Sequence, residues 1–153
     1  MEEIRLKLTE SIFEVFEKML FVFLEPADVP GSTFDMGASI RYDSGTVSGS
    51  CRIRLPQKLA GIIAQNLHGL DKDEITGKYM EDCVKESINM ICGNFLSKFD
   101  KSRIFHLSIP EVGLQCCEDT ADRKNEDVYR LDFDSDYGKL GIVTTMSVRS
   151  TYP

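Results

Sequence analysis

The stretch EDCVKESINMICGNFL, Glu81 to Leu96, has the spacing of an amphipathic helix. An α-helix turns about 100° per residue, so each residue can be assigned to a face. One face is apolar and consists of Val84, Ile88, Ile91 and Phe95. The opposite face carries Asp82, Glu86, Asn89 and Gly93. We expect the apolar face to pack on a sheet and the second set to form one row on the solvent side.

Two features of this row are unusual in a helix that serves stability alone. Gly93 lies inside the helix, where glycine is about 1 kcal/mol less favourable than alanine. Met90 and Leu96 lie between the row and the apolar face, where we expect both to be partly exposed. A Glu-x-x-Asn pair recurs by chance and can simply decorate a solvated face, with the glycine allowing a local element to pack. A functional role for Glu86 and Asn89 therefore depends on a longer pattern that includes the residues around them.

The chain before this helix predicts a helix, a hairpin and a second helix. Apolar residues at helical spacing predict a helix over about the first twenty residues, ended by Pro26 and Pro30. They are Leu8, Ile12, Val15, Phe16, Met19 and Phe23. TVSGSCRIRLP alternates between apolar and polar residues, which predicts a half-buried strand over 46–56. DSG at 43–45 should turn an earlier strand, about 33–42, onto it, and Pro56 should open a short helix that closes near Gly69.

Alternating segments at 105–109, 112–116, 129–133 and 140–148 predict further strands. The charged connection CEDTADRKNED between two of them is typical of a solvated loop. DFDSDYG, 132–138, is similar to the start of a calcium-binding loop, but the position of its glycine and Val143 favour a hairpin turn. The order of elements predicts one α+β domain over 1–153, with an antiparallel (or mixed) sheet and helices packed on one face.

Composition excludes several classes of function. The chain has 153 residues, of which 42% are hydrophobic and 28% charged, and its longest strong apolar run, 19–24, is too short to span a membrane. The absence of a signal-peptide pattern predicts a cytoplasmic protein. A net charge of −7 without a Lys/Arg cluster disfavours nucleic-acid binding. Five cysteines without Cys-x-x-Cys spacing and two isolated histidines, His68 and His106, indicate reduced thiols and no metal site in this chain.

The signature Asp82-x-x-x-Glu86-x-x-Asn89-x-x-x-Gly93-Asn94 resembles that of the chemotaxis phosphatase family that includes CheC, CheX and FliY. The N-terminal segments IFEVFEKML and VFLEP and the later LSIPEVGL are similar to the corresponding parts of CheX. CheC-like members carry two Glu-x-x-Asn helices, whereas the first helix here has no asparagine three residues after Glu14 or Glu17. A single site per chain is the CheX pattern.

The resemblance implies a CheC/CheX-like fold, a homodimer joined through its sheet, and hydrolysis of the aspartyl phosphate of a CheY-like response regulator. Asn89 would orient the attacking water, and Glu86 would pair with a lysine of the regulator. Asp82, Met90 and Gly93 would contact the partner. The Mg²⁺ would belong to the regulator, so this chain needs no cofactor of its own. The alternative is a non-catalytic CheX-like module that binds a response regulator or a component of the flagellar switch, and a bare scaffold is a third possibility.

Overall fold

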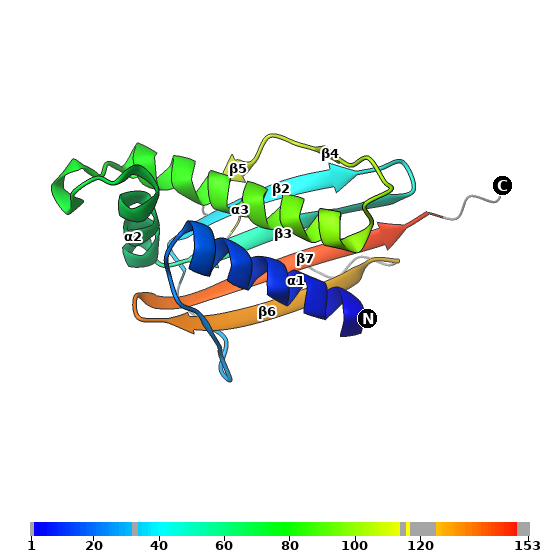
Figure 1. The fold of residues 1–153 in the computed structure, drawn as a ribbon, viewed down its shortest axis with the longest axis horizontal. Coiled ribbons are helices and arrows are strands. Elements are labelled where there is room, and N and C mark those ends of the chain that lie inside the picture. Colours follow the sequence, from blue (N-terminus) through cyan, green and yellow to red (C-terminus); the bar gives the residue numbers. More distant parts are fainter. Residues whose placement is uncertain (1, 32–33, 114–115, 117–124, 150–153) are drawn as a thin grey trace.

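The computed structural model describes residues 2–31, 34–113, 116 and 125–149. Three α-helices lie on one face of one sheet (Figure 1). They are α1 (Glu2–Glu14), α2 (Gln57–His68) and α3 (Gly77–Phe99), with a π-helical turn η1 (Val15–Met19) and a 3-10 turn η2 (Lys72–Glu74). The expected α+β architecture with helices on one face is confirmed.

The seven strands are β1 (Glu25–Pro26), β2 (Met36–Asp43), β3 (Val47–Leu55), β4 (His106–Leu107), β5 (Glu111–Val112), β6 (Asp127–Ser135) and β7 (Gly138–Val148). They run in the order β1-β6-β7-β3-β2-β4, with β5 also paired to β2. Every pairing is antiparallel, so the sheet is not mixed. The long central strands form the floor on which the helices rest.

The hairpin β2–β3 follows the predicted alternation. Val47, Cys51, Ile53 and Leu55 are at most 1% exposed, because they point toward the helices. The turn is the predicted DSG, in which Gly45 has φ 93° and the Ser44 N–H donates to the Val47 carbonyl at 2.9 Å. The DFDSDYG stretch likewise forms a hairpin, in which Ser135 pairs with Gly138.

The prediction of an N-terminal helix is confirmed, but the predicted end of this helix is wrong. Residues 15–19 form a wider π turn, in which the Leu20 N–H donates to the Val15 carbonyl at 3.0 Å. The wider turn shifts the apolar stripe, so Met19 is 45% exposed and Phe23 is 81% exposed. Leu20, Val22 and Leu24 are buried in their place, since the chain beyond the helix is extended and buries alternate residues.

The strands expected at 105–109 and 112–116 are shorter than the alternation suggested, whereas those expected at 129–133 and 140–148 are longer and lie within β6 and β7. Within 105–109 only His106 and Leu107 are paired, and Ile109 is 86% exposed. Of the described residues within 112–116, only Val112 is paired, preceded by Glu111; residues 114–115 and most of the charged connection lie outside the described residues. These short strands lie at the edge of the sheet, and among the described residues each of them pairs with β2 alone.

Candidate functional site

Helix α3 carries every residue of the signature. It begins where the Thr76 hydroxyl accepts a hydrogen bond from the Tyr79 N–H at 3.2 Å, and it continues for 23 residues. Its predicted apolar face is fully buried: Val84, Ile88, Ile91 and Phe95 are each 0% exposed. Because this face is fixed against β2 and β3, the direction of the opposite face is fixed as well.

The signature residues lie on that opposite face. Asp82 and Glu86 are exposed, and Asn89, Met90 and Gly93 are partly exposed. Among the described residues, none forms a hydrogen bond or ion pair with the side chain of Glu86 or Asn89. The acid and the amide, one turn apart, are therefore free to bind groups from outside the chain.

The first half of the row is electrically negative. Burial raises the pKa of the Cys83 thiol, and the charges of Asp82 and Glu86 raise it further. Neither carboxylate has a cationic partner among the described ion pairs. A cationic side chain of a partner would thus find an uncompensated charge at this end of the row.

Gly93 faces open space. Apart from its own neighbourhood in the helix, no atom of the described residues lies within 4 Å of the place where a Cβ would stand. The glycine therefore does not serve the packing of a local element, which was the simpler explanation of its presence. It leaves bare helix backbone on the row, and a partner can approach closely there.

The expectation for Met90 is confirmed and that for Leu96 is wrong. Met90 is partly buried against the core, whereas Leu96 is only 4% exposed. The chain turns back after α3 and covers Leu96, since Leu96 shares a groove with Phe105 and Leu107. The spacing of residues within one helix cannot predict the burial of Leu96, because that burial depends on the segment that follows the helix.

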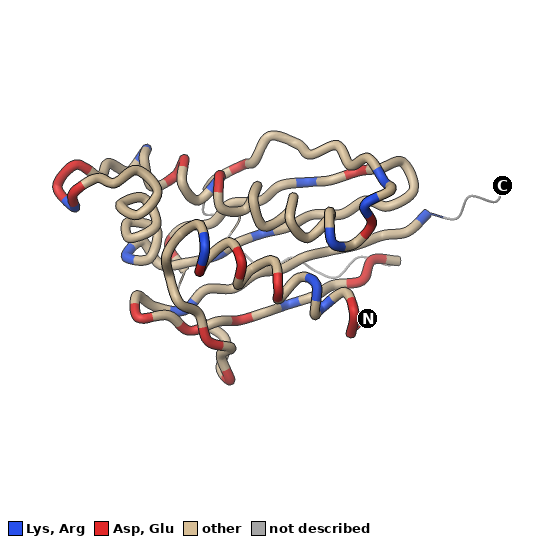
Figure 2. The backbone as a smooth tube through the Cα atoms, viewed as in Figure 1, with Lys and Arg blue, Asp and Glu red and all other residues tan. Residues whose placement is uncertain are grey.

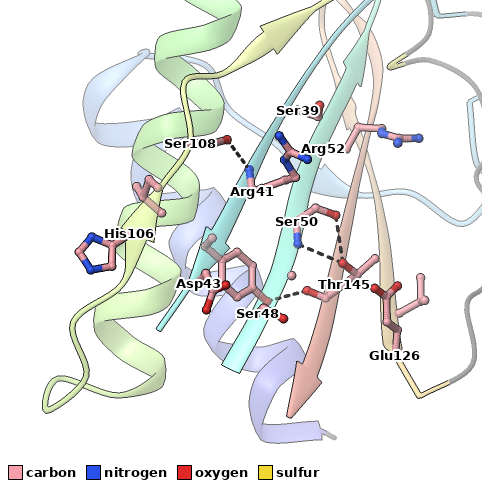
Figure 3. A pocket seen from close by; sticks show the side chains of 14 residues that line it. Ser39, Arg41, Asp43, Ser48, Ser50, Arg52, His106, Ser108, Glu126 and Thr145 are labelled. Atoms are coloured by element: carbon pink, nitrogen blue, oxygen red, sulfur yellow. Dashed lines mark hydrogen bonds between the residues drawn. The ribbon is translucent and has the colours of Figure 1, made fainter. Parts of the chain in front are cut away.

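A cavity of about 680 Å³, larger than the groove beside Leu96, lies on the face of the sheet that the helices do not cover (Figure 3). It is polar, with Arg41, Arg52, Ser39 and Ser50 on neighbouring strands, and it contains no signature residue. Polar side chains are what an antiparallel sheet normally presents to solvent. The signature row, by contrast, is the outer surface of a helix, which suits a macromolecular partner better than a small molecule.

Neither histidine belongs to the row. His68 is the last residue of α2, with its ring 5.8 Å from that of Tyr79, and His106 is exposed on β4. Among the described residues, no three His, Cys, Asp or Glu side chains are grouped so as to hold a metal ion. Within the same part of the chain, no helix is both long and apolar enough to cross a membrane.

Helix α3 thus displays an acid, an amide and a bare glycine outward, in a domain whose helices cover one face of an antiparallel sheet. The family described as chemotaxis phosphatase CheX matches residues 36–134, which include all of α3. The chain belongs to this family. None of the curated proteins is similar enough to match it.

Solved structures confirm the CheC/CheX-like fold. CheX from Vibrio vulnificus is 22% identical, with 92% of this chain and 93% of that one covered and a TM-score of 0.72. CheX from Desulfovibrio desulfuricans is 17% identical, with 95% and 99% covered and a TM-score of 0.71. The CheX of a CheX–CheY–BeF3–Mg²⁺ complex from Borrelia burgdorferi is 18% identical, with 94% and 96% covered and a TM-score of 0.66.

Proposed function

We propose that this protein removes the phosphoryl group from the aspartyl phosphate of a CheY-like response regulator and so ends a chemotaxis or other two-component signal. The observation that carries the proposal is the complete signature row of a CheX-family chain, displayed outward on α3 with its acid and amide unpaired. The complex between the Borrelia burgdorferi relative and CheY supports the choice of partner.

Asn89 is the catalytic residue in this proposal. Its carboxamide enters the active site of the regulator and holds a water in line with the bond between phosphorus and the aspartyl oxygen. Because an amide does not ionise, Asn89 acts by position and not as a general base. Positioning of this kind accounts for much of the rate of phosphoryl transfer.

Glu86 anchors the complex. Its carboxylate accepts a charge-assisted hydrogen bond from a lysine at the active site of the regulator, which fixes the register of Asn89 one turn further on. Asp82 extends the negative end of the row toward the rim of the contact, and Met90 and Gly93 contact the partner beside Asn89. The regulator contributes the Mg²⁺, and this chain contributes no metal ligand.

We also propose that two chains form a homodimer through the edge of the sheet. β1 pairs with Asp134 and Phe133 of β6. The Ala27 N–H donates to the Asp132 carbonyl and the Arg5 guanidinium to the Arg130 carbonyl, so the part of this edge that another strand can extend is residues 127–129. This contact lies on the sheet and leaves the row on α3 open to the regulator.

The proposal is tested by the decay of a phosphorylated CheY-type receiver with and without the protein. Wild type should accelerate decay, and Asn89→Ala should lose about 100-fold in kcat, the effect of losing correct positioning. Glu86→Ala should mainly raise KM. The matched control is Glu81→Ala, which removes another exposed acid of α3 that does not belong to the signature, and it should retain activity. Circular dichroism checks that each variant is folded.

Two results would contradict the proposal. Full activity of Asn89→Ala would remove the water-positioning role. If wild type binds the phosphorylated receivers of its own organism without accelerating their decay, the protein is a binding module and not a phosphatase.

A further inference from the structure

Beyond Asn89 the row opens into a groove at the C-terminal end of α3. This groove, the α3 groove, has a volume of about 490 Å³ and lies between the end of α3, the following turn and β4. Six of its lining residues are used below: Gly93, Leu96, Lys101, Arg103, Phe105 and Leu107. None of them was singled out from the sequence as part of a groove, because the groove exists only where residues 101–107 return beside the helix.

The α3 groove is continuous with the signature row. Asn89, Gly93 and Leu96 are spaced i, i+4 and i+7, so they lie on one stripe of the helix. Leu96 follows Asn89 by about 10 Å along the helix axis. A regulator that receives Asn89 in its active site therefore passes over the bare backbone at Gly93 and reaches the groove with its neighbouring surface.

The floor of the groove is apolar and held in place. Leu96 is 4% exposed and Phe105 is partly buried against the core, while Leu107 is 38% exposed and open to a partner. Phe105 contacts Tyr42 edge to face, with 5.8 Å between ring centroids, and Phe99 at 6.4 Å. A floor fixed in this way can accept an apolar side chain without rearranging first.

The rim of the groove is positive. The carboxylate of Asp100 is satisfied within its own turn, because it accepts hydrogen bonds from Ser102 and forms an ion pair with Arg103 at 2.8 Å. Lys101 is exposed and forms no ion pair with any described residue. Figure 2 shows the contrast in charge between this C-terminal end of α3 and the acidic turn that precedes the N-terminal end of the helix. That turn contains Asp71, Asp73 and Glu74.

We infer that the α3 groove is a second anchor for the response regulator and takes a segment of it that presents an apolar side chain next to a carboxylate. The apolar side chain packs on the exposed Leu107, above the floor formed by the buried Leu96, and the carboxylate pairs with Lys101. The inference rests on the proposed function for its partner. It adds that the complex has two contacts of opposite charge, Glu86 on one side of Asn89 and Lys101 on the other, which fix the direction of the regulator on the helix.

The test compares Leu107→Asp and Lys101→Glu with wild type over a range of concentrations of phosphorylated receiver. Each should raise KM about tenfold and leave kcat within about twofold, since the groove touches the partner and not the reacting atoms. The matched control is Lys58→Glu, the same change of charge on α2 at the opposite end of α3, and it should behave as wild type. Added salt should narrow the difference between wild type and Lys101→Glu.

The outcomes separate this inference from the proposed function. If Asn89→Ala abolishes activity while both groove variants keep the wild-type KM, the groove is not an anchor although the phosphatase stands. If wild type shows no phosphatase activity, the test is instead the affinity of each variant for the receiver loaded with BeF3⁻ and Mg²⁺. A loss of affinity in both groove variants supports the second anchor, and an unchanged affinity overturns it. If Leu107→Asp instead converts a sedimenting dimer to a monomer, the groove holds a second copy of this chain, and the inference is wrong.

Discussion

Replacing Gly93 by alanine should make the domain more stable and, at the same time, lower the proposed phosphatase activity. The new methyl group meets open space, so it causes no clash within the chain. Inside a helix, alanine is favoured over glycine by about 0.5–1 kcal/mol. For a domain of this size, that gain corresponds to a rise of about 1–4 °C in Tm.

The methyl group nevertheless stands on the docking face, four residues after Asn89. It holds the regulator away from the helix backbone and displaces the water that Asn89 should orient. A misplacement of about 1 Å can reduce the rate about 100-fold, so we expect a loss of about tenfold or more in kcat/KM. Thermal and urea unfolding followed by circular dichroism give the stability, and decay of the phosphorylated receiver gives the activity.

Gly61→Ala is the matched control. Gly61 also lies inside a helix, α2, and a Cβ there would meet only the Met80 sulfur at an ordinary 3.8 Å. It should therefore gain similar stability and keep full activity. A Gly93→Ala variant that is less stable than wild type would refute the open space at Gly93. One that is more stable and fully active would refute the close approach of a partner.

Two further predictions concern the scaffold that holds the row. Ile88→Ala, at a fully buried position of α3, should lower the free energy of unfolding by about 2–5 kcal/mol in urea titrations, and a loss below 1 kcal/mol would mean that this face is not packed. Tyr42→Phe should cost about 0.5–1.5 kcal/mol, because the Tyr42 hydroxyl donates to the Thr145 carbonyl at 2.5 Å. Burial raises the pKa of Tyr42 above its ordinary value near 10, so the unfolded chain releases this proton first and wild-type stability should fall as the pH rises above about 10. Unfolding measured between pH 8 and 11 should show a shallower decline for Tyr42→Phe, and equal slopes would contradict this role of Tyr42.

The sequence predicts α3 and β3 well because each buries one continuous face. In α3 the apolar residues recur at the helical period, and in β3 they alternate, so local spacing alone assigns Ile88 and Ile53 to the core. The end of the first helix is different. In the sequence, Met19 and Phe23 continue the helical spacing of apolar residues. The π turn at 15–19 breaks this spacing in the structure, and no residue type in that segment predicts a π turn.

The part of the candidate site that the sequence predicts is the part that local spacing determines. The direction of Glu86 and Asn89 follows from the burial of the opposite face and needs no knowledge of the rest of the fold. The burial of Leu96 and the groove beside it depend on where residues 101–107 return, which is a property of the tertiary structure. Likewise, the place of Phe105 between Tyr42 and Phe99 joins three separate segments and has no local signal.

The placement of the row on a packed helix has a consequence for how the site works. The side chains of Glu86 and Asn89 have no partners among the described residues, but their backbones are fixed by the buried face of α3, so binding orders only a few side-chain torsions. A loop carrying the same two residues would lose much more conformational entropy on binding. In the proposed mechanism Asn89 holds a water and does not exchange a proton, so its effect depends on how rigidly it is held. The fully buried contacts of Ile88 and Ile91 beneath the row are thus as necessary to the proposed activity as the amide itself.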